Sequence, residues 1–165
     1  MLEHVTQQNK LFPVLAKAMV FKLSSDFLWN MYDEVVSELG TGNLDRLPEL
    51  HALACCLKSV CSQDAAACVE TCRMACGGHG FMNSSGFPAT YGFAAAAATY
   101  EGENTVMLLQ TARYLLKAWK KALAGEKMVP TVAYLGEATR TRQKRPAWDG
   151  SIKGIINALR VIAAG

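Results

Sequence analysis

The chain has 165 residues, of which 51% are hydrophobic and 19% charged, and its formal net charge is +3. This composition is typical of a globular protein and argues against a disordered chain. It also argues against a dedicated nucleic-acid binder, which usually carries a clustered basic face, so we interpret the basic residues from Arg140 to Arg145 as a solvated loop. Neither a secretory signal nor a membrane span is expected, because no apolar run is long enough.

The first predicted helix covers residues 8–39, where apolar residues recur at close to helical spacing from Leu11 to Leu39. Pro13 lies near its beginning and marks either its first turn or a local bend. Glycine and asparagine at Gly40–Asn43 are expected to end the helix, because both tolerate a left-handed cap conformation.

A second helix is predicted from Pro48 to Cys76, and all six cysteines lie within it, between Cys55 and Cys76. Zinc prefers two close pairs of ligands, but one continuous helix would hold these pairs too far apart to share a metal. Disulfides between residues stacked on one helix face are geometrically poor. We therefore expect small buried thiols that pack a helix seam in a reducing compartment, and no metal site.

The sequence after the second helix predicts a loop with breakers at Asn83–Gly86 and Pro88, and then a short helical turn at Ala94–Ala98. A third long helix is expected over residues 103–124, and its apolar stripe consists of Val106, Leu109, Ala112, Leu116 and Trp119. Residues 126–149 are expected to be irregular or a short helix.

A last amphipathic helix is predicted over residues 151–164, and its apolar stripe either folds back onto the other helices or lacks a partner. No segment alternates convincingly as a strand would. The predicted fold is therefore all-α, a helical bundle.

Two segments with glycine can carry chemistry. Gly77, Gly78 and Gly80 follow the second helix, where they are either simple stop signals or positions at which the backbone comes close to a ligand. Glu101 precedes Gly102 at the entrance to the third helix. Glu101 and Glu103 either favour the helix N-terminus electrostatically, or Glu101 is a general base beside apolar walls, for which Phe93, Tyr100 and Met107 are the candidates.

These segments closely resemble the peroxisomal acyl-CoA oxidases. The resemblance lies in Cys-Arg-Met-Ala-Cys-Gly-Gly-His-Gly at 72–80 and, about twenty residues later, in Tyr-Glu-Gly-Glu-Asn-Thr-Val-Met-Leu-Leu-Gln-Thr-Ala-Arg at 100–113. Two shorter runs, at 6–13 and 47–53, extend it, so that it covers residues 5 to about 135. The related dehydrogenases share the glutamate–glycine pair, but Glu-Gly-Glu-Asn is similar to the oxidase branch.

The resemblance implies a fold like the C-terminal α-domain of acyl-CoA oxidases and dehydrogenases. Residues 1–125 would form this helical bundle, with loops that face the flavin, and residues 126–165 would form a connector and the start of a truncated C-terminal helical domain. A homodimer in the peroxisome is implied as well, although Ala163–Gly165 is not a peroxisomal targeting tripeptide.

The resemblance also implies a reaction, in which fatty acyl-CoA is oxidised to trans-2-enoyl-CoA with FAD and O2, giving hydrogen peroxide. Glu101 would be the base that removes the proton next to the thioester carbonyl, and the backbone N–H of that glutamate would stabilise the enolate together with a flavin hydroxyl. The remaining implied sites are Gly102 for the substrate and Gly77, Gly78, Gly80, Glu103 and Gln8 for FAD.

A second hypothesis stays open beside this one. The chain by itself could be a non-catalytic helical module that only pairs with another subunit. Bound yellow flavin in purified protein would separate the two hypotheses.

Overall fold

A computed structural model of the chain describes residues 3–140 and 149–164. Every regular element in these residues is helical, which confirms the predicted all-α class. Internal contacts divide the chain into two units, Met1–Thr111 and Ala112–Gly165. The long helices are α1 (Val5–Leu39), α2 (Leu47–Ala75) and α5 (Asn104–Leu123), and the shorter elements are α3 (Gly78–Phe81), η1 (Asn83–Ser85), α4 (Phe87–Ala96), η2 (Pro130–Val132), α6 (Ala133–Arg140) and α7 (Ile152–Ala164).

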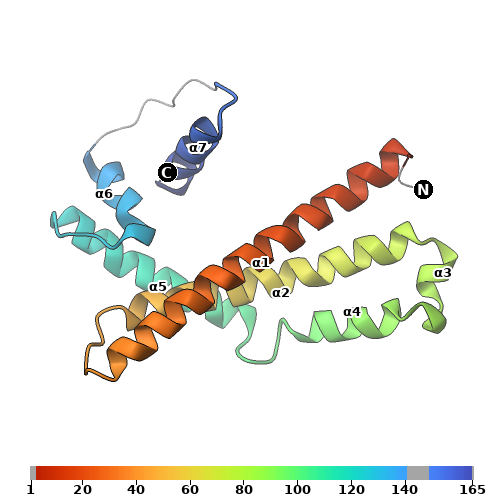
Figure 1. Cartoon of the computed structure of the whole chain (residues 1–165), viewed down its shortest axis with the longest axis horizontal. Helices are drawn as coiled ribbons and strands as arrows, with labels where there is room; N and C mark the ends of the chain where they lie inside the picture. The colour runs from red at the N-terminus through yellow and green to blue at the C-terminus, as the bar shows by residue number, and fades with distance from the viewer. Residues whose placement is uncertain (1–2, 141–148, 165) are drawn as a thin grey trace. The chain divides into compact units, whose positions relative to one another are not determined.

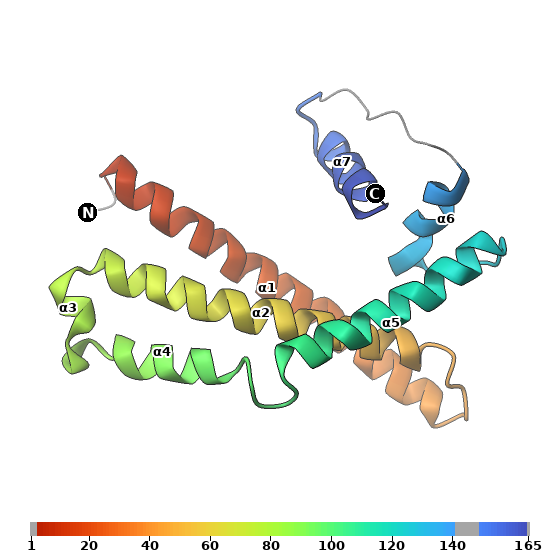
Figure 2. The ribbon, with the colours of Figure 1, turned by 180° about the vertical axis from the view of Figure 1, so that it is seen from behind.

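In the first unit, α2 lies between α1 and α4 and runs antiparallel to both (Figure 1). Figure 2 shows the same order from behind, with α3 and η1 joining the end of α2 to the start of α4. A small core of Met31, Val35 and Leu50 holds α1 against α2, and the partly buried Leu28 and Leu53 extend it. The middle helix α2 is therefore the element that positions the others.

Local sequence explains the ends of α2. Pro48 lies in its first turn, where a missing N–H costs nothing, and Arg73 lies in its last turn, where a cation suits the helix dipole. Gly77 then takes a positive φ of 61°, which L side chains rarely adopt. The prediction of a helix from Pro48 to Cys76 is confirmed to within one residue at each end.

The segment after α2 differs from the prediction. Residues Phe87–Ala96 form the ten-residue helix α4, where a loop and then a short turn at Ala94–Ala98 were expected. Pro88 is not a breaker here but occupies the first turn of the helix, and Gly86 before it has a positive φ of 75°. Proline is well suited to a first turn, and the alanines that follow are strong helix formers. The loop interpretation was therefore wrong.

The predicted apolar stripe of α1 is largely exposed in this chain. Met31 and Val35 are buried, but Leu15, Met19 and Leu23 are 59–67% exposed. Apolar residues occur on all sides of this helix rather than on one face. Exposed apolar surface of this extent is typical of a helix that other protein surface covers.

In the second unit, Ala118 and Ala122 of α5 pack against Val132 and Leu135. The predicted stripe is therefore buried only in part. Leu109 and Leu116 are 54% and 62% exposed, whereas Trp119 of the same stripe packs against this cluster. The predicted helix over 151–164 is confirmed as α7, and it contacts α6 within this unit. Arg142, Lys144 and Arg145 of the predicted basic loop lie outside the described residues.

All six cysteines are free thiols on α2 or at its C-cap. The expectation of burial holds fully for Cys55, but Cys76 is exposed because it follows the last helical residue. Burial raises the pKa of the Cys55, Cys61 and Cys68 thiols, because the charged thiolate loses hydration there.

By length and composition alone, α2 is the one helix in the described part of the chain that could cross a membrane. This is weak evidence, because the core helix of a soluble protein passes the same test. Here α2 packs against α1 and α4 and carries Lys58 and Glu70. The expectation of no membrane span stays a prediction.

Candidate functional site

The turn between α4 and α5 holds Glu101 in an unusual backbone conformation. Among the described residues other than glycine, Glu101 alone has a positive φ, of 56°. The left-handed region costs an L-residue with a Cβ roughly 1–2 kcal/mol. Such strain persists only where the surrounding structure enforces it, and it is frequent at functional sites.

Gly102 continues this turn with a φ of 98°. A Cβ atom at this position would lie 2.5 Å from Cε and 3.0 Å from Sδ of Met107. The backbone conformation therefore favours glycine here, and any Cβ would also require the flexible end of the Met107 side chain, in the first turn of α5, to move.

Lys58, near the middle of α2, reaches across to this turn. Its Nζ donates a hydrogen bond to the carbonyl oxygen of Gly102 and another to Oδ1 of Asn104, the latter at 2.8 Å. Lys58 is half-buried. One ammonium group thus connects Gly102, the residue after Glu101, with Asn104, the first residue of α5.

Hydrogen bonds to α2 also hold the side chain of Asn104. Its Nδ2 donates to Oγ of Ser62 at 2.9 Å and to the carbonyl oxygen of Ser59 at 3.3 Å. Asn104, Ser59 and Ser62 are all at least 91% buried. Buried polar groups with complete hydrogen bonding fix one arrangement, because any other would leave a donor or acceptor unpaired.

Glu103 caps the N-terminus of α5. Its Oε2 accepts hydrogen bonds from the backbone N–H groups of Thr105 at 2.9 Å and Val106 at 3.4 Å, and Oε1 accepts one from the Thr105 hydroxyl at 3.1 Å. The backbone bond from Thr105 is the main reason that the pKa of Glu103 lies below its usual value. The electrostatic interpretation of the glutamates at this helix start thus describes Glu103, whose flavin contact stays a prediction.

Glu101 itself is exposed in this chain. Phe93, one of the apolar walls expected around it, is 74% exposed, and Tyr100 is 41% exposed. Only Met107 packs closely, against Gly102. The expected apolar enclosure is therefore incomplete within these residues.

The glycine loop lies at the C-terminal end of α2. Gly77 and Gly78 are exposed, and a Cβ at either would meet no heavy atom within 4 Å. Gly80 is buried, and a Cβ there would lie 2.0 Å from the carbonyl oxygen of Arg73. Gly80 is thus required for packing, whereas Gly77 and Gly78 leave room for a ligand to approach the backbone.

The start of α1 lies beside this loop. Nε2 of Gln7 donates to the carbonyl oxygen of Ala75 at 3.3 Å, and Oε1 of Gln7 is buried with no hydrogen-bond partner. Gln8, the predicted flavin contact, is the next residue of α1. The predicted site residues therefore form two groups, one with Gln8 and the glycine loop and one with Glu101, Gly102 and Glu103.

The two groups lie far apart along α2. The Glu101 turn is bonded to Lys58, and the glycine loop follows Ala75, seventeen residues further on, which is about 25 Å at the rise of an α-helix. The structure does not bring the glycines and the glutamate into one local site within this chain.

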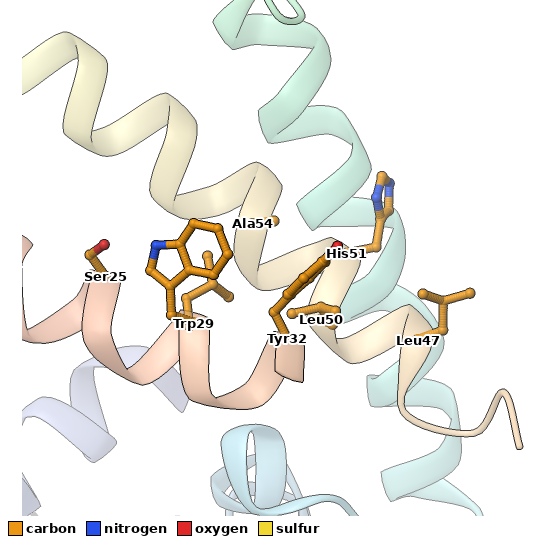
Figure 3. A pocket seen from close by; sticks show the side chains of 8 residues that line it. Ser25, Trp29, Tyr32, Leu47, Leu50, His51 and Ala54 are labelled. Carbon is orange, nitrogen blue, oxygen red and sulfur yellow. The ribbon is translucent and has the colours of Figure 1, made fainter. Parts of the chain in front are cut away.

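The described residues of the first unit include two well-formed cavities. One of about 510 Å³ lies between α1 and α2 (Figure 3). Trp29 and Tyr32 of α1 line it and meet edge to face at 5.6 Å between ring centroids, and Leu50 and His51 line it from α2. The other, of about 780 Å³, lies beside the glycine loop and is lined by Arg73, Phe81 and Tyr91 among others. Glu101 lines neither of these two cavities.

The sequence reasoning missed Lys58, Ser59 and Ser62 and gave no role to Asn104, although Asn104 belongs to the Glu-Gly-Glu-Asn motif. Lys58 and Gly102 are 44 residues apart, so no local pattern joins them. The available signal was a lysine and two serines in a helix otherwise rich in alanine, leucine and cysteine.

Comparison with protein families gives a match over most of the chain. Residues 1–116 match the family described as acyl-CoA oxidase, C-alpha1 domain. Acyl-coenzyme A oxidase 1 of Drosophila melanogaster is 58% identical over 163 residues, which are 99% of this chain and 24% of the fly protein. Peroxisomal acyl-coenzyme A oxidase 1 of Rattus norvegicus is 41% identical over 171 residues, covering 99% of this chain and 26% of the rat protein.

Solved structures give the same result. An acyl-CoA oxidase from tomato matches with a TM-score of 0.92 at 36% identity, covering 99% of this chain and 26% of the tomato protein. Acyl-CoA oxidase-1 of Caenorhabditis elegans, in complex with FAD and ATP, matches with a TM-score of 0.90 at 38% identity, covering 99% of this chain and 25% of the worm protein. The chain spans about a quarter of the length of these relatives.

Proposed function

The chain belongs to the acyl-CoA oxidase family, and from this premise we propose that its Glu101 is the base in the oxidation of fatty acyl-CoA to trans-2-enoyl-CoA. The observation that carries the proposal is the backbone of Glu101, which is held at a positive φ by a turn anchored from another helix. A capping role does not require this strain, since Glu103 caps α5.

The proposed role uses only the carboxylate and the backbone of Glu101. The carboxylate accepts the proton from the carbon next to the thioester carbonyl, and the backbone N–H of Glu101 donates to the carbonyl oxygen as negative charge develops there. The strained turn supplies orientation, since it sets the direction of both groups before substrate binds. Gly102 is proposed to lie against the acyl group, where a side chain would obstruct the approach.

FAD is the proposed cofactor, and the residues present fit it in part. Gly77 and Gly78 leave open space beside an exposed backbone, and the buried Oε1 of Gln7 nearby has no partner. Gly77, Gly78, Gly80, Gln8 and Glu103 are the residues proposed to hold it. The chemistry supplied by bound FAD is acceptance of the hydride from the β carbon and delivery of two electrons to O2, which gives hydrogen peroxide.

The wide separation of the two groups of site residues supports a homodimer. If each flavin lies at one Glu101, the glycine loop about 25 Å away along α2 is placed to contact a different flavin, that of a second subunit. The exposed apolar residues of α1 agree with further covering surface. Location in the peroxisome is proposed because relatives such as the rat protein are named peroxisomal.

A chimeric oxidase tests the proposal directly. This chain would replace the matching quarter of the Drosophila melanogaster enzyme, which is 58% identical. Glu101→Gln should keep flavin absorbance but lower peroxide release from an acyl-CoA by about 10³-fold or more. Glu126→Gln is the control, at an exposed carboxylate after α5 that has no proposed part in the site, and it should match the parent. Near-normal turnover by Glu101→Gln would remove the base assignment.

The rival function is that of a non-catalytic helical module. Its test is an absorbance spectrum of the 165-residue chain mixed with FAD, followed by peroxide detection with an acyl-CoA. Bound flavin with peroxide release would exclude the rival for the chain alone. An absence of both, with an active chimera, would mean that this chain supplies the base but needs the rest of an oxidase.

A further inference from the structure

The Glu101 turn depends on a residue that lies outside its own segment. We infer that Lys58 is a positioning residue for Glu101, acting through Gly102 and Asn104. The inference deepens the proposed function and rests on it, because the positioned group is the proposed base.

The first step is energetic. Glu101 at a φ of 56° is strained, so without external support the turn would relax toward an ordinary backbone conformation. Such relaxation would rotate the peptide groups beside Glu101 and move its carboxylate. Something in the fold must therefore favour the strained form.

The second step is that Lys58 is bonded where this support is needed. Its Nζ donates to the carbonyl oxygen of Gly102, the residue that directly follows Glu101. The orientation of that carbonyl is fixed by the φ and ψ of Gly102, a residue whose φ of 98° is itself left-handed. A charge-assisted hydrogen bond to this oxygen selects the turn conformation against its alternatives.

The third step is that Lys58 is not free to move with the turn. Its second acceptor, Oδ1 of Asn104, belongs to a buried carboxamide whose amide group donates to Ser59 and Ser62 of α2. The backbone N–H of Asn104 also donates to the carbonyl oxygen of Ala98, at 3.1 Å, which closes the turn from the α4 side. The ammonium group is thus held between α2 and α5 and supports the turn from a fixed point.

Two explanations of Lys58 other than positioning make different predictions. If the cation merely neutralised Glu103, whose pKa it helps to lower, its loss would change the pH dependence of stability and leave turnover intact. If it only joined α2 to α5, its loss would lower stability, flavin content and turnover together. A positioning role predicts a loss of turnover with flavin binding retained.

The kinetic test uses the chimeric oxidase described above. Lys58→Met keeps an unbranched, flexible side chain but removes the ammonium donors, and it should lower kcat by about 10- to 100-fold, the usual cost of a small misplacement. KM and flavin content should stay within about twofold of the parent. Lys58→Arg, which restores a cationic donor, should recover most of the loss. Lys22→Met, on an exposed lysine of α1 that pairs with Asp26, is the control and should match the parent.

A structural test uses the full 165-residue chain and does not depend on activity. Backbone couplings measured by NMR should show a positive φ at Glu101 in the parent and in Lys58→Arg, and a shifted or averaged value in Lys58→Met. Unchanged couplings, or a Lys58→Met chimera with full kcat, would overturn the inference. A parent chimera that binds flavin but gives no peroxide, with the expected couplings, would count against the proposed function and leave the support of the turn by Lys58 standing.

Discussion

The carbonyl oxygen of Arg73 lies 2.0 Å from the point at which a Cβ atom on Gly80 would stand. This oxygen belongs to the backbone of the last turn of α2, so a flexible side chain cannot give way instead. The two residues thus fix the close return of α3 onto the end of α2.

Gly80→Ala should therefore destabilise the chain. Overpacking against backbone typically costs about 1–3 kcal/mol, and we expect the upper part of that range. Gly78→Ala is the matched control, because a Cβ there meets nothing within 4 Å and its φ is not positive, so its effect should stay within about 0.5 kcal/mol. Urea unfolding followed by circular dichroism measures both, and equal midpoints for the two variants would contradict the close approach.

Glu101→Gly should stabilise the chain while removing the proposed base. Glycine adopts a positive φ without the steric cost that a Cβ carries, and the expected gain is about 1 kcal/mol, reduced somewhat by the greater freedom of glycine in the unfolded state. Glu103→Gly changes the same residue type two positions away but removes the α5 cap, so it should have the opposite sign. Thermal unfolding of both variants gives the answer, and a Glu101→Gly protein less stable than the parent would argue against strain at this position.

The carboxylate of Glu103 should contribute a stability that depends on pH. Its pKa is lowered in the folded state, mainly by the Thr105 backbone N–H, so the folded protein favours the charged form. The contribution is therefore fully present above the unfolded pKa of about 4.3 and is lost as the pH falls through the lower, folded value.

The measurement is the urea midpoint of the parent and of Glu103→Gln between pH 7 and pH 2. The parent should be more stable at neutral pH, and the difference should shrink as the solution becomes acidic. Thr105→Val removes the hydroxyl donor but keeps the more important N–H, so it should retain most of the pH dependence. A constant difference between parent and Glu103→Gln at all pH values would contradict the capping contact.

The cysteines should differ in reactivity along α2. Cys76 is exposed, whereas Cys55 is buried and its thiol pKa is raised, chiefly by that burial, so little reactive thiolate forms there. Alkylation by iodoacetamide near pH 8, followed by peptide mass spectrometry, should label Cys76 first and Cys55 last. Rapid labelling of Cys55 in the folded chain would contradict its burial.

Much of the helical layout could be predicted from the sequence, because it depends on local signals. The apolar spacing of α1 and the glycines after α2 placed those ends to within a few residues. The helix α4 was missed because Pro88 serves equally as a breaker and as a first-turn residue, and only the backbone before it decides between the two.

Only the site residues that lie within a recognised sequence motif could be predicted. Glu101, Gly102 and Glu103 could be identified from their run of letters, but Lys58 meets Gly102 across 44 residues. The backbone strain at Glu101 is likewise invisible in the sequence, since it arises from how α4 and α5 are joined. The fold was also needed to see that the predicted flavin contacts are split between the middle of α2 and its C-terminal end.

The positive φ of Glu101 also has a consequence over evolutionary time. At this position folding alone favours glycine or asparagine, so the retention of glutamate requires continuing selection for its carboxylate. In a lineage released from that selection, drift should replace Glu101 early, while Asn104 and Ser62 persist because the helices still need them. The residue at position 101 would then distinguish a catalytically active oxidase from a descendant that has lost activity but keeps the same fold.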